Sequence, residues 1–124
     1  YKQQYWLEPQ FDQIDTISPA VAEELLDTAI NCGINFAKPL LQRALNLLNK
    51  EGKESWPNLV IDGQYVPLTF QALKTYLNKR HKEGEKVLVR VLNIMQGQRY
   101  IEITENNPKY EDFFYVWILN RVAV

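Results

Sequence analysis

Apolar residues recur at helical spacing in two consecutive stretches of the chain. In the first, they cover one side of a helix at about 100° per residue, and they are Val21, Ala22, Leu25, Leu26, Ala29 and Ile30. Ser18 is a typical N-cap, Pro19 suits the first helical position and Gly33 suits the end of the helix. The second stripe consists of Phe36, Ala37, Leu40, Leu41, Ala44, Leu45 and Leu48. It predicts a helix over residues 35–50, which packs beside the first because the connection is short.

The next stretch, residues 51–66, does not follow this helical pattern. A short apolar run at residues 58–61 is followed by Asp62-Gly63, a pair that suits a two-residue turn between strands. The sequence is equally compatible with a small β-hairpin near residues 58–66 and with an irregular loop.

Helical periodicity returns after this stretch and continues to the end of the chain. Pro67 opens a predicted helix that runs to about His81, and Gly84 separates it from a long helix that ends before Asn107-Pro108. A last helix carries Phe113, Phe114, Trp117, Ile118 and Val122. The sequence therefore predicts a single, mainly α domain of about five helices over residues 1–124, without repeats or linkers.

Composition and charge restrict the functional classes. The chain has 124 residues, of which 46% are hydrophobic, and its 14 basic and 15 acidic residues give a net charge of −1. Nucleic-acid-binding domains usually have a marked basic excess, so a nucleic-acid partner is not expected. The single cysteine cannot form an internal disulfide, and no apolar run approaches the roughly 18 residues of a membrane span.

Residues that would hold a metal or act as a nucleophile do not cluster in the sequence. The only histidine, His81, lies in a basic string at residues 79–82, far in sequence from Cys32. Metal sites and nucleophilic sites need several such groups at defined spacing. We therefore expect no metal and no cofactor.

Three polar residues of the first helix are candidates for a functional role. Glu23 and Asp27 are four residues apart, so their carboxylates are neighbours on the helix surface. Two such acids can flank a glycosidic bond, or they can simply complement the positive N-terminal end of the helix. Asn31 follows Asp27 by one further turn, in a strongly apolar neighbourhood.

Several short strings, taken in order, resemble a known family. They are YKQQYW at residues 1–6, LLDTAINCG at 25–33, LQRAL at 41–45, IDGQYVPLT at 61–69, RY at 99–100, NP at 107–108 and WILNRV at 117–122. In this collinear order they are similar to glycoside hydrolase family 108 and to the predicted peptidoglycan-binding region attached to it. The chain departs from the pattern at Val66, where the family usually has glycine, and in a longer connection at residues 51–58.

The resemblance implies a lysozyme-like helical fold that cleaves the glycan strands of bacterial peptidoglycan. Members of the family are phage or prophage lysins, sometimes labelled secretion activators, and their catalytic acid is the glutamate of a Glu-Gly-Gly motif near the N-terminus. This sequence contains no Glu-Gly-Gly. We therefore expect residues 1–17 to lead in from a catalytic segment further upstream, and residues 18–124 to form the helical peptidoglycan-binding region.

The function expected from this resemblance is that of the C-terminal, peptidoglycan-binding portion of a bacterial or phage N-acetylmuramidase. This chain alone should then be inactive, with peptidoglycan glycan strands as its partner. No secretory signal is visible, so we expect synthesis in the cytoplasm and action at the cell wall. The alternative is a non-catalytic peptidoglycan-binding or phage-structural helical module. The sequence leaves the oligomeric state open.

Five residues are predicted to bind the saccharide. Tyr5 and Trp6 would stack on sugar rings, although they are equally suited to covering the core. Asp27 and Asn31 would bond hydroxyl or acetamido groups, or else anchor neighbouring backbone. Gln42 is the fifth, and its residue type favours a buried hydrogen-bonding partner over a ligand contact. If a catalytic acid does lie in this chain, Asp27 is the first candidate.

Overall fold

The computed structural model describes residues 9–50 and 57–122. Its helices are α2 (Phe11–Asp15), α3 (Pro19–Cys32), α4 (Ile34–Leu47), α5 (Pro67–Asn106) and α6 (Glu111–Arg121), with a 3₁₀ turn, η1 (Pro108–Tyr110), between the last two. The mainly α fold predicted from the sequence is confirmed. The described residues include no strand, so residues 57–66 take the irregular form and not the hairpin.

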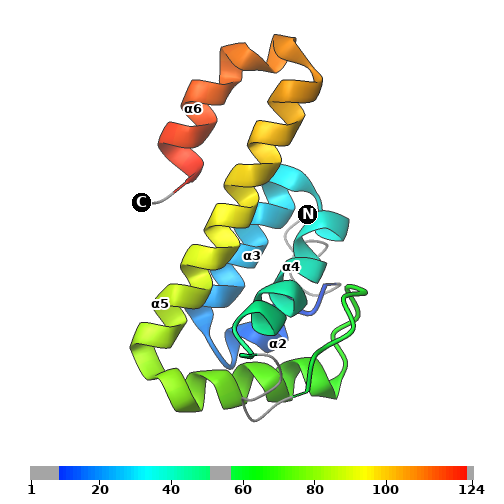
Figure 1. Ribbon diagram of the computed structural model, residues 1–124, viewed down its shortest axis with the longest axis vertical. Coiled ribbons are helices and arrows are strands. Elements are labelled where there is room, and N and C mark those ends of the chain that lie inside the picture. Colours follow the sequence, from blue (N-terminus) through cyan, green and yellow to red (C-terminus); the bar gives the residue numbers. More distant parts are fainter. Residues whose placement is uncertain (1–8, 51–56, 123–124) are drawn as a thin grey trace.

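The helices are arranged around α5, the longest element. Its first arm, residues 67–80, crosses one end of the molecule, and its second arm, residues 82–106, runs along the whole length (Figure 1). Helix α3 packs against α2, α4 and α5, and α4 also contacts α5. Helix α6 folds back beside the far end of the second arm, and the helices that it contacts are α5 and η1 (Figure 1).

The two arms of α5 meet at His81, where the backbone is not helical. Its φ of 55° and ψ of −145° turn the chain sharply. The predicted separation of two helices is therefore present, but the break lies at His81 and not at Gly84. Gly84 instead permits a close approach, because a Cβ on this residue would lie 2.0 Å from Cβ of Arg80. The carbonyl of Gly84 accepts a bond of 2.7 Å from the Tyr76 hydroxyl.

Local signals place both ends of α3. The hydroxyl of Ser18 accepts a hydrogen bond from the backbone N–H of Val21 at 3.3 Å, as an N-cap should. Gly33 ends the helix with a φ of 99°, a conformation that side-chain-bearing residues rarely adopt, and α4 begins at the next residue. This tight connection keeps α3 and α4 in contact, as the short predicted connection requires.

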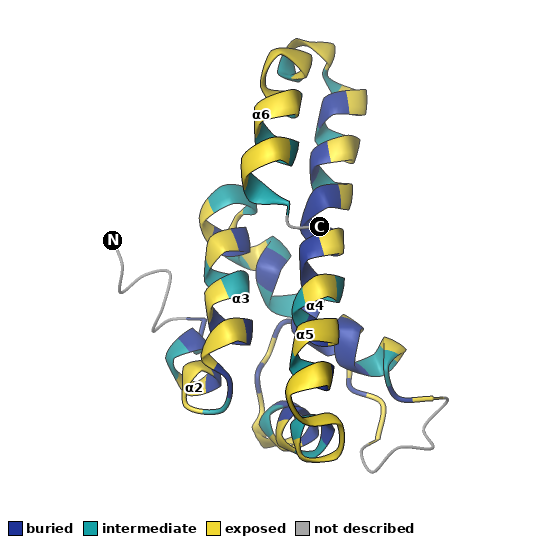
Figure 2. Ribbon diagram, turned by 90° about the vertical axis from the view of Figure 1, so that its left-hand side faces the viewer, coloured by how far each residue is buried: buried dark blue, intermediate teal, exposed yellow. Residues whose placement is uncertain are grey.

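The apolar core lies among α2, α3, α4 and both arms of α5 (Figure 2). Its fully buried side chains include Leu25, Leu41, Leu45, Leu73 and Leu88. Helix α2 adds Phe11 and Ile14, which are also fully buried. The described part of the predicted lead-in therefore packs in the same core as the rest of the chain.

Side chains of α4 hold residues 57–66 in place of a partner strand. The Asn46 amide accepts a bond from the backbone N–H of Leu59 at 2.7 Å and donates one to the Leu59 carbonyl at 2.8 Å. Just beyond the end of α4, Asn49 donates to the Asn58 side chain at 2.8 Å. Because α4 takes up these backbone groups, the segment needs no β-ladder.

None of the helices in the described ranges is long and apolar enough to span a bilayer.

Candidate functional site

The predicted saccharide-binding residues are distributed over three parts of the chain. Tyr5 and Trp6 lie outside the described residues. Asp27 and Asn31 lie one turn apart on α3, where the Asn31 amide donates to the Asp27 carboxylate at 3.4 Å near the surface. Gln42 lies on α4 and is only 1% exposed. The structure thus brings Asp27 and Asn31 together and places Gln42 in the interior.

The Gln42 amide is surrounded by hydrogen-bonding groups of the chain itself. Its Oε1 accepts bonds from the backbone N–H groups of Gly63 at 2.9 Å and Asp62 at 3.2 Å. Its Nε2 donates to the Gln64 carbonyl at 2.9 Å and lies near oxygens of Asp62 and Thr69. These contacts fix the turn at residues 62–64 against α4, which is what a buried hydrogen-bonding partner does.

The same turn is closed by the Asp62 carboxylate. It accepts a bond of 2.9 Å from the backbone N–H of Gln64. That bond, together with the Gln42 amide, holds the pKa of Asp62 below its ordinary value. The Asp-Gly pair noted in the sequence therefore forms a bend, with Gly63 at a φ of 72°, and not the two-residue turn of a hairpin.

A hollow of about 270 Å³ lies between α3 and the second arm of α5, and its lining residue Glu24 lies one turn before Asp27 on α3. It is lined by Ala20, Glu24, Glu85, Lys86, Val89, Arg90 and Asn93. Its polar groups comprise two carboxylates, two cationic side chains and one amide. Such a lining offers both donors and acceptors to a polar ligand. We name this the α3–α5 hollow.

Both carboxylates of the α3–α5 hollow are held by hydrogen bonds. Glu24 accepts a bond of 2.8 Å from the Asn93 amide, and Glu85 accepts one of 2.6 Å from the hydroxyl of Ser18. Burial raises the pKa of Glu24; the bond from Asn93 opposes this shift, and the nearby charge of Asp27 adds to it. Glu24 is therefore coupled electrostatically to a predicted site residue.

Sequence reasoning missed the contribution of α5 to this surface. Glu24 lies on α3, but its hydrogen-bonding partner Asn93 lies 69 residues away on α5. Asn93 itself is buried and sits inside a long amphipathic stretch. No local spacing rule connects the two residues, so only the packing of α3 on α5 identifies them as a pair.

The exposed position of Asp27 bears on its suitability as a catalytic acid. A glycosidase acid is usually kept protonated by an apolar, enclosed setting. Asp27 is solvent-exposed, and its carboxylate accepts a hydrogen bond from the Asn31 amide. Its geometry suits hydrogen bonding to a ligand better than proton donation. Across the described ranges, no group of three or more His, Cys, Asp or Glu residues is placed to hold a metal ion.

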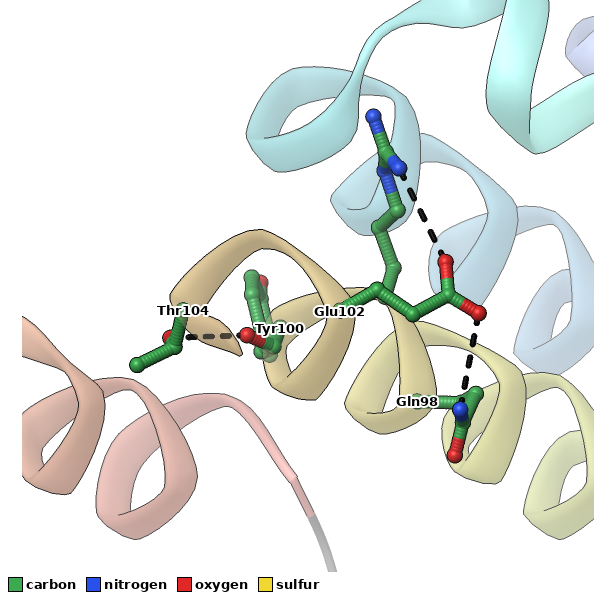
Figure 3. Close-up of polar contacts among 5 residues, drawn as sticks. Gln98, Tyr100, Glu102 and Thr104 are labelled. Carbon is green, nitrogen blue, oxygen red and sulfur yellow. Dashed lines mark hydrogen bonds and ion pairs between the residues drawn. The ribbon is translucent and has the colours of Figure 1, made fainter. Parts of the chain in front are cut away.

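A second amide–carboxylate pair with the same spacing lies on the second arm of α5. Gln98 donates to Glu102 at 3.4 Å, and Arg99 forms an ion pair with Glu102 at 3.7 Å (Figure 3). Tyr100 and Thr104 form a separate row of the helix, where the Thr104 hydroxyl donates to the Tyr100 carbonyl at 2.8 Å (Figure 3). The Gln98–Glu102 pair is thus a structural match for Asn31–Asp27 outside the α3–α5 hollow.

Comparison with known proteins assigns the chain to a family. The model of a family described as "predicted peptidoglycan domain" matches residues 36–122, from the first turn of α4 to the residue after α6. Among curated proteins, none matches the chain significantly. The matched region includes Asn93, whereas Glu24, Asp27 and Asn31 precede it. Because the match covers most of the chain, this protein belongs to the predicted peptidoglycan domain family.

Proposed function

We propose that this chain is the peptidoglycan-binding, C-terminal portion of a bacterial or phage N-acetylmuramidase and acts at the cell wall. The observation that carries the proposal is the family match over residues 36–122. The ordered strings that resemble glycoside hydrolase family 108 support the enzymatic parent. The net charge of −1 is compatible with a partner that is not a polyelectrolyte.

The surface that we assign to binding combines the Asp27–Asn31 pair with the α3–α5 hollow. Peptidoglycan presents hydroxyl, acetamido and peptide groups, all of which need hydrogen-bond donors and acceptors. The Asp27–Asn31 bond is long, at 3.4 Å, so both side chains keep bonding capacity for a ligand. Glu24 and Asn93 extend the same polar surface onto α5.

The chain is proposed to bind without turnover. Glycoside hydrolysis requires a carboxylic acid that protonates the leaving oxygen. In glycoside hydrolase family 108, which the chain resembles, a Glu-Gly-Gly motif supplies this acid, and this sequence lacks the motif. In this proposal, the catalytic glutamate lies in an upstream segment of the parent protein, and the present chain contributes recognition of the wall.

Cosedimentation with insoluble peptidoglycan tests both the binding and its location. The chain should be retained, and replacing Asp27 and Asn31 together by alanine should weaken retention about tenfold, the equivalent of about 1.4 kcal/mol. The matched control replaces Gln98 and Glu102, the second amide–carboxylate pair, and should bind normally. Failure of the unaltered chain to sediment would reject the function. Equal loss in both double variants would reject the location alone.

A turbidity assay on cell walls separates the enzymatic parent from the alternative, a non-catalytic or phage-structural module. This sequence contains no Glu-Gly-Gly, which both the proposal and the alternative accommodate. The chain alone should not clear walls, whereas a longer protein that includes an upstream Glu-Gly-Gly should clear them. Clearing by the chain alone would contradict the proposal, and Asp27→Asn would then be the first variant to examine.

A further inference from the structure

Helix α6 exposes most of its apolar surface. Among its side chains, Phe113 is 55% exposed, Tyr115 75%, Val116 50% and Leu119 65%, and no residue of the helix is buried (Figure 2). An apolar patch of this kind on one helix is typical of an interaction site. This contrasts with α3 and α4, whose apolar sides lie in the core.

The residues of α6 divide into two sides. The inner side, formed by Phe114, Trp117, Ile118 and Arg121, is half-buried. It is held to α5 by Trp117, whose ring centroid lies 5.3 Å from that of Tyr100. At 100° per residue, the opposite side consists of Asp112, Phe113, Tyr115, Val116, Leu119 and Asn120, and we call it the outer face. A helix that is apolar on both sides is normally covered on both, so the outer face calls for a second partner.

The charges of α6 indicate which partner fits. Its N-terminal end carries Glu111 and Asp112, and its C-terminal end carries Arg121. A helix that binds an anionic membrane surface is usually rich in lysine and arginine on its polar side, and α6 is not. Arg121 lies on the inner side, over the rings of Tyr100 and Trp117. The Asp112 carboxylate is therefore the one charge of the outer face, and it calls for a hydrogen-bond donor on a partner helix. Antiparallel packing would also oppose the two helix dipoles favourably.

A second copy of α6 supplies this donor. If two copies pair in antiparallel fashion with Val116 on the two-fold axis, positions whose numbers sum to 232 face each other. Asp112 then faces Asn120 of the other copy, whose amide can donate to the carboxylate. Phe113 faces Leu119 in the same arrangement. Such a self-complementary contact is what a two-fold dimer requires.

We propose that the outer face of α6 is a homodimer interface, in which two copies of the helix pair antiparallel about Val116. An 11-residue helix is about 16 Å long, which puts the contact at the small end of specific interfaces. We therefore expect the dimer to dissociate on dilution. This inference is independent of peptidoglycan binding, since the outer face shares no residue with the α3–α5 hollow.

Sedimentation velocity over a range of concentrations tests the dimer. The full chain should shift from monomer to dimer as its concentration rises. Val116→Arg should abolish the shift, because it places two like charges on the axis. The matched control is Val60→Arg, at a 74% exposed valine outside α6, and it should dimerise normally. A chain that stays monomeric throughout, or a dimer that tolerates Val116→Arg, would overturn the proposal.

A charge-reversal pair tests the antiparallel register. Asn120→Asp should weaken the dimer at least several-fold, because two carboxylates then face each other at each end. Adding Asp112→Lys should restore it, since lysine then faces aspartate. Both positions are exposed, so circular dichroism of the monomers should be unchanged. If the double variant dimerises as weakly as Asn120→Asp alone, the antiparallel register is wrong.

Discussion

The core region and α6 use apolar residues in opposite ways. In the core region, formed by α2, α3, α4 and both arms of α5, apolar side chains of four elements bury one another. Helix α6 is equally apolar, but among the described elements its main contacts are with α5 and η1, and it buries none of its residues. The difference shows that apolar content does not determine burial. The number of elements available to cover a helix does.

The two regions also differ in the side chains of α5 that pack against them. Near the core, α5 presents Leu88 and Leu92, which are fully buried. Towards α6 its buried side chains become polar or aromatic, as in Gln96 and Tyr100, and Gln96 donates to the Tyr100 hydroxyl at 2.8 Å. Ring contacts and hydrogen bonds, which depend on geometry, thus replace close apolar packing. We expect the core region to resist opening and α6 to separate first.

The largest effect should come from a core leucine. Leu41→Ala removes a fully buried side chain and leaves a cavity among α3, α4 and α5, so the free energy of unfolding should fall by about 2–5 kcal/mol. Leu47→Ala is the matched control on the same helix, at a 66% exposed position, and should change it by about 0.5 kcal/mol or less. Urea denaturation measures both. Similar losses of unfolding free energy in the two variants would contradict the difference between the buried and the exposed side of α4.

The next effect concerns the polar contact that fixes residues 62–64. Gln42→Ala leaves the buried N–H of Gly63 without its acceptor, which should cost about 1–3 kcal/mol. Amide hydrogen exchange at Gly63 and Gln64 should accelerate before the helices exchange. Gln98→Ala, at an exposed glutamine, is the control. Normal protection of Gly63 in the Gln42 variant would show that the turn does not depend on this side chain.

A smaller effect is expected where α6 meets α5. Trp117→Ala removes the ring that lies against Tyr100, Tyr110 and Phe113, with centroid distances of 5.3–6.1 Å. Helix α6 should loosen at a cost of about 1 kcal/mol, while the core region stays folded. Hydrogen exchange should rise in residues 108–121 and not in α3. Cooperative loss of protection in both regions would mean that α6 and the core unfold as one unit.

The smallest effect should appear at Glu24, beside the α3–α5 hollow. Its pKa is raised in the folded chain, so its contribution to stability is complete below the ordinary value of 4.5 and is lost as the pH rises through the folded pKa. Glu24→Gln resembles the protonated form at every pH. The variant should therefore be slightly more stable than the parent near pH 7 and equal to it in acid. Thermal melts from pH 3 to pH 8 measure this.

The control for that comparison is an exposed glutamate. Glu105→Gln, on the second arm of α5, should not reproduce a gain that grows with pH. A Glu24 variant that loses stability at neutral pH would mean that the charged carboxylate, with its bond from Asn93, is the stabilising form.

Much of the fold could be predicted from short-range signals. Ser18, Pro19 and Gly33 place the ends of α3 because capping and positive φ depend only on local backbone geometry. The apolar stripe of α4 predicts its buried side for the same reason. The helix that opens at Pro67 does end near His81 as predicted, but Gly84 lies inside the second arm of α5 and does not separate two helices. The predicted second helix ends at Leu47 instead of extending to residue 50. Boundaries of this kind depend on packing as well as on local preference.

The candidate site was less accessible to sequence reasoning. The Asp27–Asn31 pair could be recognised because a spacing of four residues makes side chains neighbours on any helix. The contacts of Gln42 with residues 62–64 and of Glu24 with Asn93 join residues 20 to 69 positions apart. Such contacts have no periodicity in the sequence, so no spacing rule anticipates them.

The sequence by itself determined the mainly α class, the near-neutral charge and the resemblance to a peptidoglycan-binding family, because these depend on composition, periodicity and short strings. Only the tertiary structure decided which polar residues meet at the α3–α5 hollow and which apolar side of α6 stays exposed. The physical reason is the same in both cases. A side chain's partners across the fold are set by how whole helices pack, and helical periodicity specifies the faces of a helix without specifying what covers them.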